Sequence, residues 1–295
     1  NAINNQPRIP FLIPLFSQNE YLLSHQNSFW RATSYISNNS TSLLIDKNLL
    51  SNIGSSLANF HVFFKHLNTS KIHYLNPDFH SLPKYISEYN SSLAKATNCP
   101  NEMLLYSDSL HVIKTINKFK KNILADYRLM TKTLRTKYIV HGDPKSDNFL
   151  IDHQNKSVLA ILDLDTVQPG FIELDFGDCI RSFCNPTGED YNPSLKPYFD
   201  ITLFESFLNG YLPILIPSFP GKNYMQMVYF IKIITFELGI RFFTDFLNGD
   251  QYFSIKYKNH NLHRAKIQFD LLTNIEHQWK SIVQTMSYSI NKYKI

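Results

Sequence analysis

A short stretch near the middle of the chain carries the residues best suited to chemistry. An apolar strand at 138–140 runs into a His-Gly-Asp sequence that ends at Asp143, and Asn148 follows five residues later. A second apolar run then ends at Asp163, fifteen residues after Asn148. Carboxylate and amide oxygens are ligands that Mg²⁺ prefers, and a carboxylate can also orient the proton of an attacking hydroxyl. The combination predicts phosphoryl transfer from ATP, with Asp143 as the base and with Asn148 and Asp163 holding Mg²⁺.

A lysine in the same loop strengthens this interpretation. Lys145 lies two residues after Asp143, which is the Asp-x-Lys-x-x-Asn spacing of protein-kinase catalytic loops. A cation at this position would offset charge that develops on the phosphate oxygens. His141 is predicted to brace the loop through hydrogen bonds and not to act as a base. The competing interpretation is that Asp143 and Asn148 are ordinary turn residues and that Asp163 caps a strand.

The elements that position these residues change in character along the chain. Residues 11–36 have the composition of two strands that flank a polar turn at 25–28. Apolar residues at three- and four-residue spacing then predict one helix over 46–67 and a second over 103–132. Short apolar runs predict three strands, at 138–140, 148–151 and 158–164. Helical periodicity returns in three later stretches, near 200–211, 223–247 and 262–285.

Composition and charge exclude several classes of protein. The chain has 295 residues, 43% of them hydrophobic, and a formal net charge of +5. Its basic residues are scattered, which argues against nucleic-acid binding. The three cysteines are Cys99, Cys179 and Cys184. Their odd number and spacing argue against a disulfide framework and favour a cytoplasmic protein. The best apolar stretch, 227–240, is interrupted by Lys232 and Glu237, so no membrane span is predicted.

The loop and the segment after it resemble a known family. The His-Gly-Asp…Asn loop followed by Ile-Leu-Asp is similar to that of the aminoglycoside phosphotransferase and choline kinase superfamily. The N-acetylhexosamine 1-kinase branch is most similar, since 162–166 read Leu-Asp-Leu-Asp-Thr and 175–178 read Asp-Phe-Gly-Asp. The resemblance extends from residue 8 to about residue 280. It implies an α+β, protein-kinase-like two-lobed fold with an incomplete N-terminal β lobe and a mainly helical C-terminal lobe.

The same resemblance implies two domains and a nucleotide site. Residues 1–37 would be the remnant of the small β-rich N-lobe and would end at the hinge. Residues 38–295 would form the mainly helical C-lobe with the catalytic loop and the acceptor site. The last N-lobe strand leads into Ser34, Tyr35 and Ile36, and these residues are expected to contact ATP.

Acceptor residues follow from the resemblance as well. In the hexosamine kinases an Arg and a Tyr eleven residues apart contact the sugar, and Arg241 and Tyr252 have this spacing. The alternative for Arg241 is a structural ion pair with Glu237, one helical turn earlier. Asp143 would bind the anomeric hydroxyl of the sugar, and Asp165 would add to the metal site.

The chain also departs from the family pattern. The family begins with a glycine-containing turn over the phosphates and a strand lysine, and neither is visible before the hinge. We therefore expect an incomplete chain with little or no kinase activity, because placement supplies most of this catalysis. Two alternatives stay open: a kinase for an aminoglycoside, choline or homoserine, and an inactive, pseudokinase-like binding module. All of these interpretations require Asp143, Asn148 and Asp163 to converge around one divalent cation in a cleft between lobes.

Overall fold

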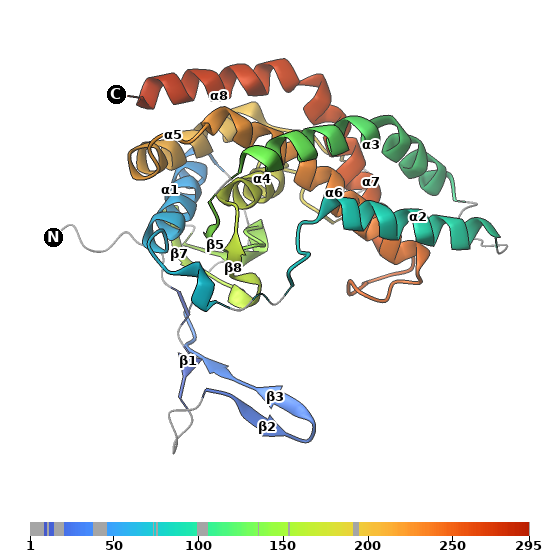
Figure 1. Ribbon diagram of the computed structural model, residues 1–295, viewed down its shortest axis with the longest axis horizontal. Coiled ribbons are helices and arrows are strands. Elements are labelled where there is room, and N and C mark those ends of the chain that lie inside the picture. Colours follow the sequence, from blue (N-terminus) through green and yellow to red (C-terminus); the bar gives the residue numbers. More distant parts are fainter. Residues whose placement is uncertain are drawn as a thin grey trace.

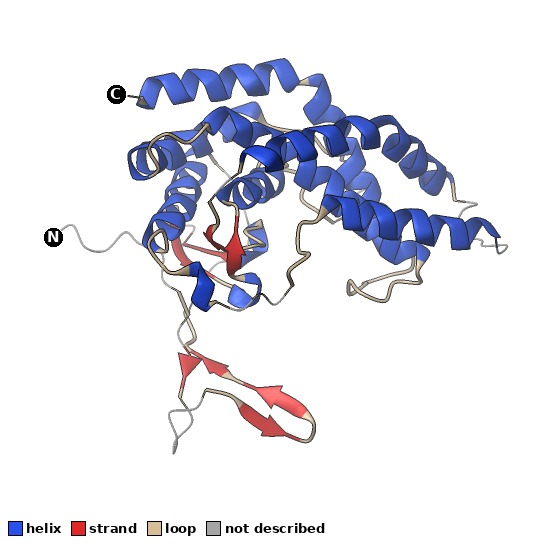
Figure 2. Cartoon of the chain, viewed as in Figure 1, coloured by secondary structure: helices blue, strands red, loops and turns tan. Residues whose placement is uncertain are grey.

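A narrow β ribbon projects from a body built mainly of helices (Figures 1 and 2). The computed structural model describes residues 9–10, 12–14, 21–37, 46–72, 74, 76–98, 106–134, 136–152, 154–190 and 195–294. Cys99 and residues 1–8 of the predicted N-lobe lie outside the described residues. The mixed α+β architecture with a large helical part is the one that the sequence predicts, whereas the boundary between the predicted domains at 37 and 38 stays a prediction.

The ribbon consists of two antiparallel pairs, β1 (Leu12–Ile13) with β4 (Ala32–Thr33), and β2 (Leu23–His25) with β3 (Ser28–Trp30). Gln26 and Asn27 form the two-residue connection of the β2–β3 hairpin, and both have positive φ, 48° and 60°. Two positive φ values in succession match the twist of a tight hairpin. The predicted order of strand, polar turn and strand is therefore confirmed, but the turn is confined to Gln26 and Asn27, and the second strand is divided at Arg31 into β3 and β4.

The body contains eight described helices: α1 (Lys47–Phe63), α2 (Leu82–Asn98), α3 (Ser107–Thr133), α4 (Ile172–Phe183), α5 (Ile201–Ser218), α6 (Met227–Leu247), α7 (His260–His277) and α8 (Trp279–Tyr293). Short 3₁₀ turns occur at η1 (Thr69–Lys71), η3 (Ser146–Asn148), η4 (Leu164–Thr166) and η5 (Tyr224–Gln226). Every residue of α4 is buried, and this helix runs through the middle of the body (Figure 1). A helix buried on all sides is a rigid base for functional groups.

Two glycines allow α1 and α5 to pack with their backbones in contact. A Cβ atom on Gly210 would lie 1.8 Å from the carbonyl oxygen of Ser51, and one on Gly54 would lie 2.3 Å from the carbonyl oxygen of Phe207. No other residue type fits such a close approach. The contact fixes the orientation of α1 and thereby places its last turn, which carries His61, against the buried helix α4.

Two small antiparallel sheets hold the segment that the sequence predicts to be catalytic. Their pairs are β5 (Tyr138–Val140) with β8 (Gln168–Gly170), and β6 (Phe149–Asp152) with β7 (Ser157–Ile161). Figure 2 shows these strands among the helices of the body. The loop 141–148 connects β5 to β6, and Asp163 lies just beyond the end of β7. The three predicted strands of this region are confirmed within two or three residues.

Some helix boundaries differ from the predicted ones. The first helix ends at Phe63 and not at residue 67, because Asn68 begins a separate turn in which its side chain accepts the N–H of Ser70. The stretch 262–285 is divided at Gln278 into α7 and α8. Helix α2 was not predicted, since its sequence is rich in Ser, Asn and Lys on the exposed side. In the part of the chain that the structure describes, no helix combines the length and apolarity needed to cross a membrane.

Candidate active site

A buried aspartate on α4 holds the start of the loop 141–148, which the sequence predicts to be the catalytic loop. Asp175 accepts the backbone N–H of His141 at 2.7 Å and that of Gly142 at 2.8 Å, each with a different carboxylate oxygen. The ring of His61 lies 3.0 Å from the same carboxylate. Burial by itself raises the pKa of Asp175, but the hydrogen bond with His61 and the backbone donors outweigh it and lower the pKa. Asp175 is therefore a charged clamp on the loop.

His80 contacts the loop from the opposite side. Its Nε2 donates to the carbonyl oxygen of Gly142 at 3.0 Å, and its Nδ1 lies 2.8 Å from a carboxylate oxygen of Glu237 on α6. Gly142 itself has φ of +87°, and a Cβ atom there would lie 2.7 Å from the carbonyl oxygen of Thr166. The backbone N–H of Gly142 is thus bonded to the buried Asp175, and its carbonyl oxygen is bonded to the buried His80. This arrangement fixes the backbone immediately before Asp143.

His141 braces the loop in the way that the sequence predicts. Its Nδ1 accepts the backbone N–H of Asp143 at 3.2 Å, and its Nε2 donates to the carbonyl oxygen of Leu162 at 2.8 Å. The hydrogen bond from the Thr166 hydroxyl to the His141 carbonyl, at 2.8 Å, adds a further connection to the segment after β7. The side chain of His141 is fully engaged in these contacts, so it holds two segments together.

Three predicted residues of the loop meet at hydrogen-bond distance. Lys145 Nζ lies 2.7 Å from Asp143 Oδ2, and Asn148 Nδ2 lies 3.1 Å from the same oxygen. Burial raises the pKa of Asp143, the charge of Asp178 raises it further, and Lys145 opposes both; the net pKa is raised. Burial lowers the pKa of Lys145, but the contact with Asp143 outweighs burial, so the net pKa of the lysine is raised. The pair therefore carries opposite charges that stabilise each other.

Asp163 and Asp165 lie at a cavity of about 880 Å³ between the body and the ribbon. Ser34, Tyr35 and Ile36 line the same cavity, so the residues predicted to contact nucleotide and two predicted metal ligands share one space. Asp163 has a left-handed backbone with φ of 57° and is exposed. An uncommon φ of this kind at a non-glycine residue is often found at functional sites.

The backbone connects this cavity to the catalytic loop. Leu162 donates its N–H to the carbonyl oxygen of Asn148 at 2.8 Å, which places Asp163 one residue beyond a contact with the loop. Asp165 forms an ion pair with Arg31 of the ribbon. No group of three or more His, Cys, Asp or Glu side chains in the described residues could hold a metal ion. The predicted set includes the amide of Asn148, and its role as a metal site stays a prediction.

Arg241 and Tyr252 lie together in a second pocket, of about 280 Å³. The Arg241 guanidinium carbon lies near four aromatic rings. Its distances to the ring centroids are 5.6 Å for Phe79, 5.1 Å for Tyr85, 5.9 Å for Tyr252 and 5.5 Å for Phe253. Among the described residues, Arg241 forms no ion pair with Glu237, which was the alternative. The Glu237 carboxylate contacts His80 instead. Aromatic faces position the guanidinium and leave its N–H edge available to a ligand.

The loop that carries Tyr252 is anchored by one carboxylate. Asp245 accepts the backbone N–H groups of Gln251, Tyr252 and Phe253 at 2.9, 2.8 and 2.9 Å. It also accepts the side-chain amide of Asn261 at 3.0 Å. Since Asp245 is on α6 one turn after Arg241, this helix carries the arginine and also holds the tyrosine against it.

Sequence reasoning assigned no role to His61, His80 or Asp245, although these residues hold the site together. A single histidine in a helical or loop segment gives no local signal, because its partners lie far away in the chain. His61 is separated from Asp175 by 114 residues and His80 from Glu237 by 157 residues. Glu237 was considered only as a partner of Arg241.

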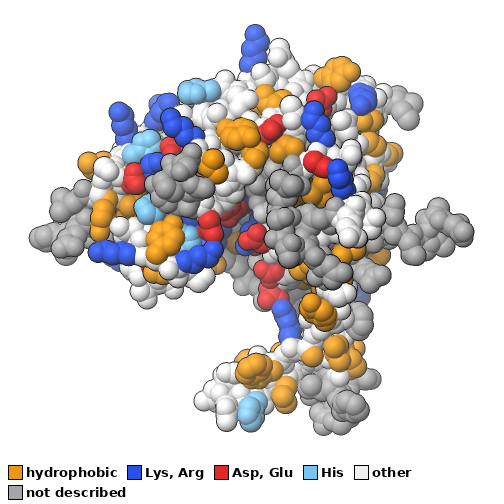
Figure 3. All heavy atoms as spheres, turned by 180° about the vertical axis from the view of Figure 1, so that it is seen from behind, with side chains coloured by type: hydrophobic (Ala, Val, Ile, Leu, Met, Phe, Trp, Pro, Cys, Tyr) orange, Lys and Arg blue, Asp and Glu red, His pale blue; other side chains and the backbone are white. Residues whose placement is uncertain are grey.

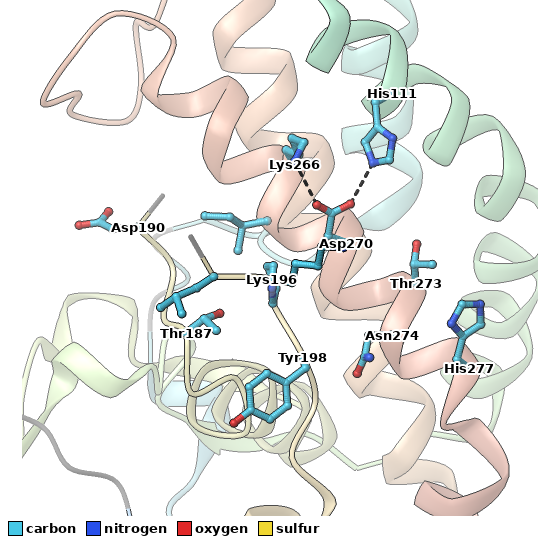
Figure 4. A pocket seen from close by; sticks show the side chains of 13 residues that line it. His111, Thr187, Asp190, Lys196, Tyr198, Lys266, Asp270, Thr273, Asn274 and His277 are labelled. Atoms are coloured by element: carbon cyan, nitrogen blue, oxygen red, sulfur yellow. Dashed lines mark hydrogen bonds and ion pairs between the residues drawn. The ribbon is translucent and has the colours of Figure 1, made fainter. Parts of the chain in front are cut away.

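A larger cavity, of about 920 Å³, lies against α7 and contains none of the residues predicted to be catalytic. Figure 4 shows the side chains of His111 and Lys266 pointing toward Asp270 in this pocket. The corresponding distances are 2.9 and 3.3 Å. In this pocket, Asp270 therefore contacts side chains from both α3 and α7.

Comparison with known proteins gives the same fold. The sequence model described as "Phosphotransferase enzyme family" matches residues 22–204. An aminoglycoside phosphotransferase from Alicyclobacillus acidocaldarius has 12% identity and a TM-score of 0.54, covering 96% of this chain and 78% of the other. Choline kinase from Cryptosporidium parvum has 11% identity and a TM-score of 0.55, covering 98% and 78%. An amicoumacin kinase bound to AMP-PNP and Ca²⁺ has 12% identity and a TM-score of 0.53, covering 90% and 72%.

Proposed function

Because the chain belongs to the phosphotransferase enzyme family, we propose that it transfers the γ-phosphate of ATP to a sugar hydroxyl. The proposed acceptor is the anomeric hydroxyl of an N-acetylhexosamine. Family membership makes the chain an enzyme that phosphorylates an alcohol group of a small molecule. The choice of a sugar, and of this hydroxyl, goes further and rests on the residues of the acceptor pocket.

The contact among Asp143, Lys145 and Asn148 is the observation that carries the proposal. Asp143 would accept or orient the proton of the acceptor hydroxyl, and its raised pKa makes it a better base than an ordinary aspartate. Lys145, held 2.7 Å from Asp143, would face the phosphate oxygens. Asn148 uses its Nδ2 for both of its contacts with Asp143, at 2.7 and 3.1 Å. Since Nδ2 points to Asp143, the amide oxygen of Asn148 points away from Asp143. In this proposal, that oxygen binds a metal ion together with Asp163 and Asp165.

The cavity between ribbon and body suits a nucleotide. Its volume of about 880 Å³ is within the usual range for small-molecule sites. Leu12, Ile36, Leu150 and Leu162 supply apolar surface for a base, and Asp163 and Asp165 supply oxygen ligands for Mg²⁺. When bound, ATP supplies the phosphoryl group and Mg²⁺ offsets its charge. Among the described lining residues the positive charge comes from Arg31, which contacts Asp165.

The second pocket favours a neutral, oxygen-rich acceptor. A cationic acceptor such as choline or an aminoglycoside prefers an empty aromatic cage or an acidic cleft. Here the guanidinium of Arg241 already occupies the space over the rings of Phe79, Tyr85, Tyr252 and Phe253. Its remaining N–H groups would donate to hydroxyl or acetyl oxygens of a sugar. The pocket is close to the loop, because a Cβ on Gly142 would lie 3.3 Å from the ring of Phe79.

Phosphorus NMR of an acceptor panel tests the proposal. The longest natural form of the protein is incubated with ATP, Mg²⁺ and one of N-acetylglucosamine, N-acetylgalactosamine, kanamycin, choline or homoserine. We expect a sugar 1-phosphate signal with the N-acetylhexosamines and none with the other alcohols. Phosphorylation of choline or of an aminoglycoside in preference would refute the sugar assignment. Nucleotide binding without transfer to any acceptor, in the longest natural form of the chain, would favour the pseudokinase-like binding module.

A further inference from the structure

His80 is a buried titratable group for which phosphoryl transfer itself has no use. It is 9% exposed, and both of its ring nitrogens face oxygen atoms. Nε2 lies 3.0 Å from the Gly142 carbonyl oxygen, and Nδ1 lies 2.8 Å from Glu237 Oε1. A carbonyl oxygen and an ionised carboxylate only accept hydrogen bonds, so both nitrogens must donate. A neutral imidazole has a single N–H group, whereas an imidazolium has two.

We infer that His80 is an imidazolium that acts as a positioning residue for Asp143, by fixing the Gly142 carbonyl through an ion pair with Glu237. The inference rests on the proposed function only in so far as Asp143 is the base. The charged pair connects α6, which carries the acceptor-pocket residue Arg241, to the catalytic loop. One helical turn separates Glu237 from Arg241, and Phe79, the neighbour of His80, lies under the Arg241 guanidinium at 5.6 Å.

The groups around His80 favour the charged ring. Burial lowers the pKa of His80, but the charge and hydrogen bond of Glu237, together with the charge of Asp178 on α4, outweigh burial and raise the pKa. On α3, the Tyr127 hydroxyl donates to the His80 carbonyl oxygen at 3.3 Å. Arg241 is the nearby positive charge on α6, and its guanidinium faces the aromatic rings of the acceptor pocket.

The alternative is a neutral pair in which Glu237 carries the shared proton. An ordinary glutamic acid has a pKa about two units below that of an imidazolium, so the proton prefers the ring. Glu237 Oε2 is buried with no hydrogen-bond partner among the described residues, so a proton on that oxygen would have no acceptor. The two forms therefore differ in which atom of the Nδ1–Oε1 contact holds the proton, and the greater basicity of the ring favours the imidazolium.

The backbone at His80 also shows that its position is imposed by its contacts. Its φ is +60°, in the left-handed region that a histidine seldom adopts. Such a conformation persists when several contacts determine it together. Three contacts do so here, through both ring nitrogens and the carbonyl oxygen. The Gly142 backbone opposite has φ of +87°, so two uncommon backbone conformations meet at one hydrogen bond.

Nitrogen-15 NMR of protein labelled at histidine tests the protonation state without any need for kinase activity. We expect the signals of His80, identified as those lost in His80→Gln, to show both ring nitrogens protonated at about pH 8, where an ordinary imidazole is neutral. They should change to those of a neutral ring in Glu237→Gln, in which the amide can donate to Nδ1 and leave Nε2–H for Gly142. If the signals lost in His80→Gln are those of a neutral ring at this pH, the inference is overturned.

Hydrogen exchange tests the positioning role. In His80→Gln, amides of the peptide that covers 141–148 should exchange about tenfold faster than in the natural chain, because the loop loses a charge-assisted hydrogen bond. His111→Gln is the matched control, since His111 also pairs with a carboxylate at 2.9 Å but lies in the pocket against α7. It should leave exchange in 141–148 unchanged. Equal exchange in all three proteins would refute the positioning role, whatever the acceptor of the enzyme proves to be.

Kinetics separate positioning from simple folding support. In an active form of the protein, His80→Gln should lower kcat about tenfold to a hundredfold, since small displacements of a catalytic group are costly. KM for ATP should stay within about twofold, because His80 does not line the nucleotide cavity. Glu237→Gln should retain more of kcat than His80→Gln, because it preserves the hydrogen bond to Gly142. The inference would be contradicted if Glu237→Gln lost more of kcat than His80→Gln, or if His80→Gln lost as much ATP affinity as kcat.

Discussion

The body and the ribbon, which meet at the cavity proposed to bind nucleotide, differ in how firmly they are held. In the body, the loop 141–148 that is proposed to be catalytic is bonded to the buried residues Asp175 and His80, and its geometry is set before any ligand arrives. On the ribbon side, large apolar residues face solvent, among them Phe29 at 73% and Tyr35 at 88% exposure. Figure 3 shows hydrophobic side chains gathered on this projecting ribbon.

The difference indicates which part of the chemistry is preorganised. The groups proposed to act on the acceptor hydroxyl belong to the rigid body, where electrostatic stabilisation requires no rearrangement. Groups that would enclose the nucleotide belong to a thin ribbon, which an ion pair between Arg31 and Asp165 connects to the body. Substitutions on the body side should therefore change activity and stability strongly, whereas those on the ribbon side should have modest effects.

The largest expected effect is that of Asp143→Asn. Loss of the base should reduce phosphate transfer about a thousandfold, within the usual contribution of general base catalysis. Nucleotide affinity should be retained, because Asp143 does not line the nucleotide cavity. Transfer is measured by phosphorus NMR and affinity by calorimetry. Asp147→Asn, an exposed residue of the same loop, is the control and should be neutral. Full activity of Asp143→Asn would show that the base is elsewhere.

The next largest effect is expected for Asp175→Ala. This change removes a buried carboxylate that accepts two backbone N–H groups and pairs with His61, so the free energy of unfolding should fall by about 3–5 kcal/mol. Urea denaturation measures it. The exposed Asp147→Ala should change the same quantity by less than about 0.5 kcal/mol. A loss for Asp175→Ala as small as that of the control would show that the clamp is not needed for folding.

Asp175 also predicts a pH dependence of stability. Its pKa in the folded chain is lowered below the ordinary value, so the folded state keeps the carboxylate charged where the unfolded chain begins to protonate it. This contribution is fully present above about pH 4 and is lost as the pH falls through the lowered pKa. In Asp175→Asn, the free energy of unfolding should fall less steeply as the pH is lowered below about 4. Urea denaturation at a series of pH values measures this dependence. Parallel acid limbs for the two proteins would contradict this assignment.

A smaller effect is expected at the acceptor pocket. Arg241→Ala should raise KM for the acceptor about tenfold to a hundredfold, because it removes charge-assisted hydrogen bonds to the sugar. KM for ATP should be nearly unchanged, since Arg241 lies in the separate pocket of about 280 Å³. Steady-state kinetics with each substrate varied measure both constants. Arg128→Ala, an exposed arginine of α3, serves as the control. An increase confined to KM for ATP would exclude Arg241 from acceptor binding.

The smallest effect is expected on the ribbon side. Arg31→Ala removes an exposed ion pair with Asp165, and such pairs contribute about 0–1 kcal/mol to stability. The free energy of unfolding should stay within that range, and the difference from the natural chain should shrink at high salt. Thermal unfolding at two salt concentrations measures it. A loss of several kcal/mol would mean that the ribbon is held as firmly as the catalytic loop.

Local patterns in the sequence predicted the structure of the segment 138–163 well, because its residues lie close together in the chain. The strand at 138–140, the loop with Asp143, Lys145 and Asn148, and the approach of Asp163 to that loop follow from order and spacing. The resemblance to the hexosamine kinases led us to expect Arg241 and Tyr252 to lie together, and they line one pocket. The helix over 103–132 was predicted from periodicity and is observed over 107–133.

The supports of the site were not predictable in the same way. His61 and His80 reach the loop through tertiary packing, and their sequence neighbours give no indication of a partner more than a hundred residues away. Whether Arg241 forms an ion pair with Glu237 or packs only against aromatic rings likewise depends on the direction of the Glu237 side chain. Side-chain direction on a helix is decided by the elements packed around it, and periodicity alone does not contain that information.

The backbone contact between α1 and α5 has a consequence for how this enzyme can change over evolution or in a mutant library. Gly54 and Gly210 each meet a carbonyl oxygen of the opposite helix, so a side chain at either position would separate the pair. Helix α1 carries His61, which contacts the Asp175 carboxylate that holds the loop 141–148. Substitution of either glycine should therefore reduce turnover although no residue of the site itself is changed. Selection for new acceptors should therefore leave both positions invariant while the rim around Tyr252 diversifies.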